Sequence, residues 1–323
     1  MAASDTVVCL GVHVLDIHGR PISQIPETGQ AGARIEEIRL SAAGTAAGTA
    51  VDLAKLGAHV ISIGSIGSDE VGDFLLALMH RHGVDTRGVV RTDAAQTSAT
   101  ILPIKPNGDR PAFHVVGANA HLTIEHVDRK MLTSGSILLL GGPDSMGPFC
   151  GSDARTVLGW ARQGGMVTTM DLLGARPSLR ADDLRALLPL VDHLLPNEEQ
   201  LGDLFGVTDP LDAARRAIDC GVGCVVVSLG PDGCLVVDAS GHVHVPGRVV
   251  DVVDTTGCGD ALTAGYVRGL MTGLAPAAAA EIGVLAASLV ATGLGSDAGI
   301  VDLAGTLAAA DRFAVRTPSR AFN

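Results

Sequence analysis

The stretch at residues 254–260, DTTGCGD, decides the fold of this chain. It follows an apolar run of strand type at residues 249–253 and precedes a helical pattern with a mostly apolar face. A turn between a strand and a helix leaves unpaired backbone N–H groups at the helix N-terminus. Because Gly257 and Gly259 have no Cβ, an anion can approach these groups closely. The stretch therefore predicts an anion site formed by the amides of Gly257, Cys258 and Gly259.

Asp260 closes this stretch and stands in the first turn of the expected helix, where the helix dipole favours its ionised form. An ionised carboxylate beside an anion site is suited to accept a proton from a hydroxyl that attacks phosphorus. Asp260 is therefore the predicted general base, with an ordinary helix-terminal acid as the alternative for the motif taken alone. The same helix N-terminus leads us to expect a lowered thiol pKa at Cys258.

The rest of the chain alternates strand-length apolar runs with helical patterns, which predicts an α/β fold with a mainly parallel central sheet covered on both faces. Two segments, roughly 16–40 and 97–122, break this alternation. We expect them to form β-strands off the main sheet that make a small lid. No internal repeat or linker divides the sequence, so the prediction is a single domain over residues 1–323 with two lid insertions.

Composition excludes several classes of partner. The formal net charge is −12 and no run of Lys and Arg interrupts it, which argues against nucleic acid and anionic membranes as partners. The longest apolar tract, residues 275–295, carries Glu281 and is expected to be a buried helix rather than a membrane span. The N-terminus has no signal-peptide pattern, and the six scattered cysteines form no CxxC pair. We therefore expect a cytoplasmic protein with reduced thiols and a small soluble substrate.

The DTTGCGD stretch resembles the C-terminal signature of the PfkB family of carbohydrate kinases, which have the ribokinase-like fold. Further landmarks of that family occur in order: GVHVLD at 11–16, GTAAGTAVDLAKLG at 44–57, GSIGSDEVG at 64–72, PNEEQ at 196–200 and SLGPDG at 228–233. The resemblance covers most of the chain and implies a three-layer αβα sandwich. It implies an ATP-dependent phosphotransferase that phosphorylates a primary hydroxyl of a sugar or sugar-containing small molecule. Mg²⁺ as a cofactor and a homodimer held by two lids also follow from it.

The resemblance implies an acceptor site. Asp16 matches the family's acid that accepts hydrogen bonds from two substrate hydroxyls, and the backbone of Gly44 and Thr45 is where a sugar approaches closely. Gly48 stands where the family usually has an Asn that contacts the sugar, and helix packing is an alternative reason for this glycine. Three histidines of the expected lid region are candidates to replace the lost hydrogen bond; they are His13, His18 and His114.

The resemblance also implies nucleotide and cation positions. The nucleotide-binding candidates are Asn197, Ser228, Gly230 and Gly233, although a plain Pro-Asp-Gly turn also explains the glycine of SLGPDG. Gln200 replaces the family's acid that helps to organise the water shell of Mg²⁺, so an indirect role is expected there. Asp254 and the carbonyl of Thr256 match positions that hold a monovalent cation, K⁺, in several relatives, with help from a loop near residues 291–297.

Other functions fit less well. The glycines of residues 64–72 have the spacing GxxGxxxxG rather than the GxGxxG of dinucleotide-binding proteins, and the chain contains no Gly-Lys pair for a Walker-type site. A nucleoside kinase of the same fold and a non-catalytic sugar- or nucleotide-binding member stay open as alternatives. Aromatic residues make up 2% of the chain, which favours a sugar over a nucleoside; Phe113 is the candidate to stack on a base.

Overall fold

The central sheet has nine strands in the order β13-β12-β11-β10-β9-β8-β1-β4-β5 in the computed structural model, which describes residues 6–29, 31–174, 176–320 and 322. From β5 to β11 neighbouring strands pair in parallel, and β12 and β13 complete the sheet with antiparallel pairing. The strands are β1 (Thr6–Gly11), β4 (His59–Gly67), β5 (Asp85–Thr92), β8 (Ile137–Gly141), β9 (Val167–Asp171), β10 (His193–Leu194), β11 (Cys224–Ser228), β12 (Gly233–Asp238) and β13 (Gly241–Pro246). The predicted mainly parallel sheet is confirmed.

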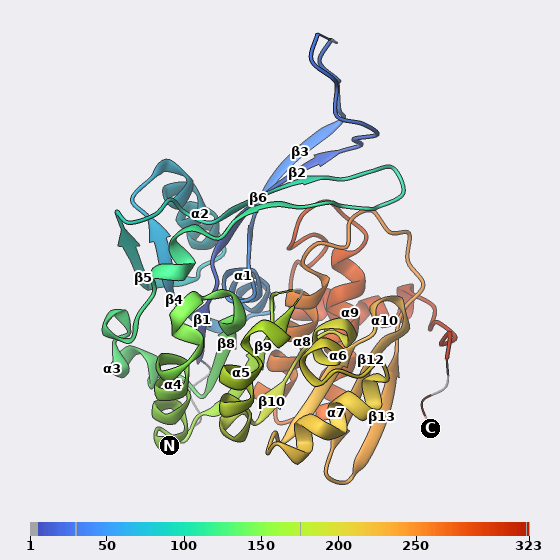
Figure 1. The fold of residues 1–323 in the computed structure, drawn as a ribbon. Helices are drawn as coiled ribbons and strands as arrows, with labels where there is room; N and C mark the ends of the chain where they lie inside the picture. Colours follow the sequence, from blue (N-terminus) through green and yellow to red (C-terminus); the bar gives the residue numbers. More distant parts are fainter. Residues whose placement is uncertain (1–5, 30, 175, 321, 323) are drawn as a thin grey trace.

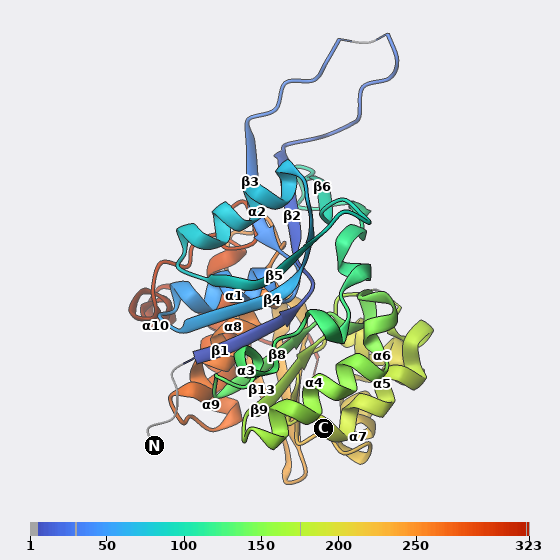
Figure 2. The same cartoon turned by 90° about the vertical axis from the view of Figure 1, so that its left-hand side faces the viewer.

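Two layers of helices cover the two faces of this sheet (Figures 1 and 2). One layer contains α1 (Ala47–Lys55), α2 (Glu70–Arg81), α8 (Cys258–Met271), α9 (Pro276–Val290) and α10 (Leu303–Arg312). The other contains α4 (Ser152–Gln163), α5 (Ala181–Leu187), α6 (Glu198–Phe205) and α7 (Pro210–Asp219), with the short α3 (Arg129–Leu132) near its edge. Within β1, Val8 and Leu10 enter one core cluster while Val7 and Cys9 enter the other. This alternation confirms the three-layer αβα sandwich.

Short 3₁₀ segments complete the connections between these elements. They are η1 (Gly117–His121), η2 (Ile124–His126), η3 (Pro143–Ser145), η4 (Gly147–Cys150), η5 (Pro177–Arg180), η6 (Leu188–Leu190) and η7 (Gly230–Asp232). The last of them joins β11 to β12.

Small residues allow α8 and α9 to approach very closely. A Cβ added to Gly265 would lie 2.7 Å from the Cα of Gly283, and one added to Gly269 would lie 2.7 Å from the Cα of Ala279. This close contact fixes α8, and with it the turn that precedes α8, against the rest of the layer. The apolar tract that forms α9 is largely buried, as expected. Within the described residues no helix has the length and apolarity needed to cross a bilayer.

A smaller sheet of four strands, in the order β3-β2-β6-β7, extends from the body of the protein beyond the carboxyl end of β1 (Figure 1). Its strands are β2 (Val14–Arg20), β3 (Glu37–Ala43), β6 (Ala99–Pro103) and β7 (Phe113–Val115). β2 pairs antiparallel with β3 and parallel with β6. These strands lie within or close to the two segments that break the βα alternation of the sequence. The connection between β2 and β3 reaches far from the rest of the molecule (Figure 2).

The register of the small sheet separates a polar face from an apolar one. Asp16 of β2 lies opposite Ser41 on β3 and Thr100 on β6. The next residue, Ile17, lies opposite Leu40 on β3 and Ile101 on β6. Because directly opposed residues point to the same face, the face of Ile17 also carries Leu40, Ile101 and Phe113, and Phe113 is 56% exposed. Phe113 therefore points away from the face of Asp16. Our expectation that it stacks on a substrate base within its own chain is wrong.

Candidate active site

The candidate residues gather at the carboxyl ends of the parallel strands, the edge where open α/β sheets bind ligands. Asp16 lies on β2, shortly after the end of β1. Asn197 follows β10 and forms an isolated parallel bridge with Ser228, the last residue of β11. The acceptor and nucleotide positions therefore share one edge of the sheet, together with the N-terminus of α8.

The turn before α8 has the geometry of an anion site. Gly257 is the N-cap of α8 with φ of 80°, a left-handed conformation that favours glycine. Among the described residues, the backbone N–H groups of Gly257, Gly259 and Asp260 have no recorded acceptor. A Cβ on Gly259 would meet open space, whereas one on Gly257 would lie 2.2 Å from the carbonyl oxygen of Ser296. The turn is therefore open at Gly259, where a side chain would lie, and the loop at Ser296 packs against it at Gly257.

Asp260 lies in the first turn of α8 with an unusual pKa. Burial raises the pKa of its carboxyl to about 7, the negative charge of Asp16 acts in the same direction, and the positive charge of Arg110 opposes both. The sequence indicated the effect of the helix dipole, which favours the ionised form, but it did not indicate this rise of the pKa by burial. A carboxylate with a pKa near neutral pH is matched to the work of a general base.

Gly48 lies directly against this carboxylate. A Cβ at position 48 would come within 2.7 Å of Oδ2 of Asp260 and 3.4 Å of the Cα of Ala43. The residue therefore does more than permit helix packing, because its missing side chain leaves the space that Asp260 occupies. Nearby, Gly44 has φ of 82°, and a Cβ there would lie 2.6 Å from the carbonyl oxygen of Val12. The buried hydroxyl of Thr45 has no hydrogen-bond partner among the described residues.

Cys258 does not have the lowered thiol pKa that the sequence led us to expect. Burial raises its pKa to about 12, and the nearby negative charges of Asp254, Asp52 and Asp260 act in the same direction. Its Sγ lies 3.5 Å from the carbonyl oxygen of Ala287 on α9, so the side chain points into the helix layer and not toward the open amides. The expected lowering of the pKa is wrong, because burial against α9 outweighs the helix dipole.

Arg110 is a site residue that the sequence analysis missed. It lies in the connection between β6 and β7, and its Nε donates to Oγ1 of Thr255 at 3.0 Å. Its charge lowers the pKa of both Asp16 and Asp260, which places it near both carboxyls. No motif surrounds Arg110 in the sequence. The available signal was a basic residue in a lid segment of a strongly acidic chain.

The three candidate histidines have different environments. His13 is buried, and its ring nitrogens contact the carbonyl oxygen of Gly11 and Oγ of Ser62, so its contacts are internal. His18 is also buried and bridges Asp254 and Ser41. His114 pairs with Thr100 across β6 and β7, with its Nδ1 3.0 Å from Oγ1 of Thr100. His114 thus lies on the face of Asp16 and keeps its Nε2 without a recorded partner among the described residues.

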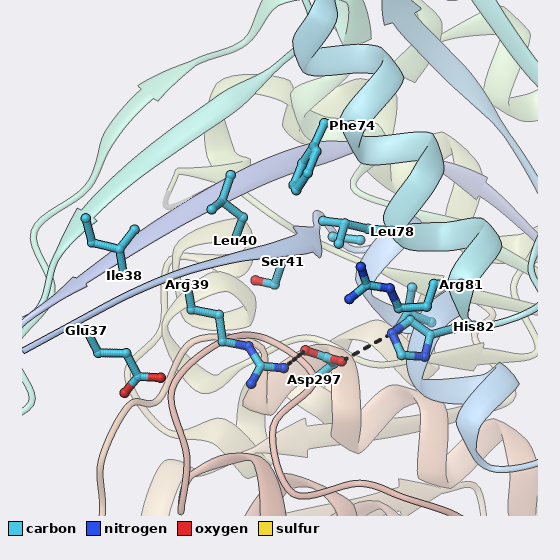
Figure 3. A pocket seen from close by; sticks show the side chains of 12 residues that line it. Glu37, Ile38, Arg39, Leu40, Ser41, Phe74, Leu78, Arg81, His82 and Asp297 are labelled. Carbon is cyan, nitrogen blue, oxygen red and sulfur yellow. Dashed lines mark hydrogen bonds and ion pairs between the residues drawn. The ribbon is translucent and has the colours of Figure 1, made fainter.

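The loop at residues 295–297 is held by charged residues of two other elements, β3 and α1, and His82, which follows α2, lies close to it. Asp297 accepts hydrogen bonds from Arg39 of β3 at 2.9 Å and from Lys55 of α1, and His82 lies 3.8 Å from it (Figure 3). Burial alone would raise the pKa of Asp297, but Lys55 and Arg39 outweigh it and lower the pKa. Arg39, His82 and Asp297 border a cavity of about 420 Å³ between β3 and α2. The ion pairs fix the loop that supports Gly257.

The nucleotide candidates form a turn with strict backbone requirements. Gly230 has φ of 57° and opens η7, and a Cβ there would meet open space. Gly233 has φ of 93°, and a Cβ there would lie 2.1 Å from the carbonyl oxygen of Val245 on β13. The turn therefore explains Gly233 by itself, whereas Ser228 and Gly230 remain available to a nucleotide.

Asn197 and Gln200 form a reciprocal cap at the start of α6. Oδ1 of Asn197 accepts from the backbone N–H of Gln200 at 2.8 Å, and Oε1 of Gln200 accepts from the backbone N–H of Asn197 at 3.0 Å. The amide nitrogen of Gln200 donates to the carbonyl oxygen of Leu172 at 3.1 Å. Both ends of the Gln200 side chain are thus engaged within the protein. The indirect magnesium role of Gln200 stays a prediction.

Replacing Gln200 with glutamate is expected to lower the melting temperature at neutral pH. The carboxylate can still accept from Asn197 but has no proton to donate to Leu172, and this loss costs about 1–3 kcal/mol. Protonation of the new carboxylate at low pH restores a donor. The difference in melting temperature between wild type and the variant should therefore shrink as the pH falls. Thermal melts at several pH values measure it, with the exposed Glu199→Gln as the matched control. An unchanged melting temperature would contradict the structural role.

Asp52 is a second group that sequence reasoning missed. It lies on α1, one turn after Gly48, and is fully buried. Neither carboxyl oxygen has a hydrogen-bond partner among the described residues. Burial raises its pKa well above the ordinary value; the negative charges of Asp297 and Asp260 add to this effect, while Lys55 opposes it. A single Asp in a predicted amphipathic helix carries no sequence signal for this environment.

Asp52→Asn is expected to stabilise the protein at neutral pH by about 2 kcal/mol, since the amide is neutral at every pH whereas the buried carboxyl must either bind a proton or be ionised at a cost. The folded-state pKa is raised, so the wild type loses stability relative to the variant as the pH rises above 3.8, the ordinary value for an aspartate. Denaturant unfolding at several pH values measures the difference, and the exposed Asp93→Asn serves as the control. A variant less stable than wild type at neutral pH would show that Asp52 has an ionic partner in the fold.

Comparison with known proteins relates most of the chain to one family. The family description "pfkB family carbohydrate kinase" matches residues 5–302. An uncharacterized sugar kinase of Archaeoglobus fulgidus is 31% identical over 232 residues, 68% of this chain and 86% of that protein. A probable chloroplastic fructokinase-6 of Arabidopsis thaliana is 28% identical over 288 residues, 84% of this chain and 71% of that protein. A crystal structure of a putative ribokinase II from E. coli with ATP and Mg²⁺ superimposes with a TM-score of 0.82 at 22% identity, covering 96% of this chain and 99% of that one.

Proposed function

The chain belongs to the pfkB family of carbohydrate kinases, and from this premise we propose that it transfers the γ-phosphoryl group of ATP to a primary hydroxyl of a sugar or a sugar-containing small molecule. The observation that carries the proposal is the position of Asp260. Its carboxyl, with a pKa near neutral, adjoins open backbone amides on one side and senses the charge of Asp16 on the other. A base between an anion site and an acceptor-binding acid is the arrangement that phosphoryl transfer requires.

In the proposed reaction Asp16 accepts hydrogen bonds from two hydroxyls of the acceptor and orients it. Asp260 takes the proton of the attacking hydroxyl as the bond to phosphorus forms. The amides of Gly257 and Gly259 donate to the phosphate oxygens, and these dipoles are already oriented before the substrate arrives. The N–H of Cys258, the third amide of the predicted anion site, donates to the carbonyl oxygen of Thr255 at 3.4 Å instead. Gly44 and Thr45 let the acceptor approach the backbone, and Gly48 keeps space for the base.

Magnesium is proposed to arrive with ATP. Within the described part of the chain, no group of three or more His, Cys, Asp or Glu side chains is arranged to hold a metal ion. The phosphates of ATP supply most ligands of Mg²⁺ in such sites, which fits this scarcity of protein ligands. Bound there, the ion neutralises phosphate charge during transfer. Asn197, Ser228 and Gly230 would then contact the nucleotide beyond the phosphates.

The small sheet is proposed to act as a lid. It carries Asp16 and His114 on one face, and its β6–β7 connection brings Arg110 to the turn before α8. A positive charge at that point stabilises the charge that develops on the transferred phosphoryl group. Closure of the sheet over the acceptor also excludes water, which would otherwise compete as the acceptor.

A sugar acceptor is favoured over a nucleoside. Phe113 lies on the face of the small sheet opposite Asp16, so it offers no ring to a base in its own site. His114 provides a polar contact on the correct face instead. A relative named as a probable fructokinase is consistent with a sugar acceptor, whereas one named as an aminoimidazole riboside kinase keeps a riboside as the second candidate.

A panel of acceptors tests the function. ADP release should be measured with ribose, fructose, other ketoses and common nucleosides at saturating MgATP. We expect turnover with at least one sugar well above the rate without an acceptor. Affinity for a sugar without ADP release, measured by calorimetry, would instead indicate a non-catalytic binding member of the family.

We also propose that two copies associate through the apolar face of the small sheet. Ile38 and Ile101 are 64% and 56% exposed, and Leu40 and Phe113 lie beside them on this face. A contiguous exposed apolar patch on a sheet is a typical protein interface. Light scattering should give the mass of a dimer, and Ile101→Glu should give a monomer.

We also propose a cytoplasmic location for this protein. The six cysteines are free, which fits this proposal.

A further inference from the structure

The carboxylate of Asp254 is completely buried, and donors of this chain already occupy it. Its Oδ1 accepts from the backbone N–H of Thr256 at 2.9 Å and from Oγ1 of the same residue at 2.6 Å. Its Oδ2 accepts from Nδ1 of His18 at 3.1 Å and from the backbone N–H of Gly295 at 3.3 Å. A carboxylate offers about four lone-pair positions. The four recorded donors therefore leave Asp254 no position for a metal ion.

His18 is the unusual member of this set, because it comes from the small sheet. Its Nδ1 must be the donor, since an ionised carboxylate only accepts. Its Nε2 lies 2.8 Å from Oγ of Ser41 on the neighbouring strand β3. Ser41 in turn lies 3.0 Å from Oγ of Ser296 and accepts from the backbone N–H of Ser296 at 3.3 Å. The His18 ring thus connects the small sheet to two loops behind the anion site. One loop contains Asp254, and the other contains Ser296.

These two loops determine the shape of the anion site. Asp254 orients Thr256 directly before Gly257, and Ser296 lies against Gly257 where a Cβ would not fit. In relatives a monovalent cation bound at the positions of Asp254 and Thr256 organises the same turn, which is the expectation that the resemblance raised. Here the residues do not fit that ion, because the carboxylate that would ligate it is saturated by protein donors.

We propose that His18 takes the place of a monovalent cation behind the anion site, so that this chain binds ATP and turns over without potassium. His18 is a positioning residue in this proposal: it acts on the phosphates through Asp254, Thr256 and Gly257. Through His18, the conformation of the turn before α8 also depends on strand β2, which carries Asp16 two residues before His18. The acceptor side and the phosphate side are thereby connected by side chains instead of by an ion. The proposal rests on the kinase function proposed above.

The first experiment compares potassium with cations that cannot replace it. ATP affinity by calorimetry, melting temperature and ADP release are measured in KCl, NaCl and choline chloride at equal ionic strength. For wild type, we expect the ATP affinity and the rate of ADP release to agree within about twofold among the three salts, as a general salt effect would allow. The melting temperature should be nearly the same in all three. A saturable gain of tenfold or more in ATP affinity or rate with KCl alone would overturn the proposal. Affinity and melting do not depend on turnover, so they test the proposal even if the kinase function fails.

The second experiment uses variants of His18 in potassium-free buffer. Loss of a hydrogen bond to a charged group costs a factor of about ten to a hundred, so His18→Ala should raise the Kd and KM for ATP by that factor. His18→Asn should recover much of the affinity, because its amide nitrogen can replace the Nδ1 donor. Adding KCl should improve His18→Ala specifically, since the variant leaves Oδ2 of Asp254 with a free position.

The matched control is His59→Ala, which removes an exposed histidine at the start of β4. It should match wild type in ATP affinity and in all three salts. If His18→Ala binds ATP as tightly as wild type without potassium, or if His18→Asn is as impaired as His18→Ala, the positioning role is wrong. A merely structural role would lower the melting temperature of His18→Ala but would not make its ATP affinity depend on potassium.

Discussion

Asp260→Asn is expected to lower kcat by about 10²- to 10⁴-fold, the usual contribution of a general base. The amide keeps the size of the side chain but cannot accept the hydroxyl proton. ATP affinity should change little, because the backbone amides that face the phosphates are retained. Steady-state kinetics with the best acceptor, together with calorimetric titration of ATP, separate the two effects. A variant that keeps more than about a tenth of the wild-type rate would sink the assignment.

The pH profile provides an independent check on the same group. Burial places the pKa of Asp260 at about 7, and the base must be deprotonated to act. For wild type, kcat/KM should therefore rise as the pH increases through that value and level off above it. The residual kcat/KM of Asp260→Asn should not show this rise with pH. Coincident profiles for the two proteins would assign the titration to another group.

Gly257→Ala is expected to abolish ATP binding and to destabilise the fold. The new Cβ would lie 2.2 Å from the carbonyl oxygen of Ser296, and φ of 80° is itself unfavourable for alanine. The turn must therefore move, at a cost of about 2–4 kcal/mol, and its amides no longer converge on one anion. Gly259→Ala is the matched control two residues away. Its Cβ would enter open space, so its free energy of unfolding should equal or exceed that of wild type.

Denaturant unfolding and ATP titration of both glycine variants check this pair. The expected pattern is a large loss of stability for Gly257→Ala alone. Should the two variants unfold at the same denaturant concentration, the contact between Gly257 and Ser296 would not be a determinant of the turn.

The family, the three-layer fold and the carbohydrate-kinase activity could be predicted because they depend on local sequence. The DTTGCGD turn places a glycine where a left-handed φ is needed, and the structure has Gly257 in that conformation. Strand-length apolar runs likewise predicted a parallel sheet because both of its faces are buried. Each of these features is determined by residues close together in the sequence. The five further motifs occur in the order typical of one family, which makes membership of another family a poor explanation of the sequence.

Properties that depend on distant neighbours were not predictable in this way. The pKa values of Asp260 and Cys258 depend on burial by α1 and α9, which no local pattern reports. The orientation of Phe113 follows from the register of β6 and β7, and a shift of one residue would reverse it. Arg110 reaches Thr255 across 145 positions of sequence. The contact is a product of tertiary structure and has no counterpart in the spacing of motifs.

The contact between Gly48 and Asp260 bears on how substrate preference can evolve in this chain. An asparagine at position 48 is common in the family that the sequence resembles, yet here its Cβ would lie 2.7 Å from Oδ2 of Asp260, the proposed base. Restoring that asparagine alone should therefore damage the base before it gains a sugar contact. The asparagine fits only if the Asp260 side chain moves, because the nearest backbone atom, the Cα of Ala43, lies at 3.4 Å. Positions 48 and 260 are thus coupled, because the side chain that position 48 can accept depends on where the carboxylate of Asp260 lies.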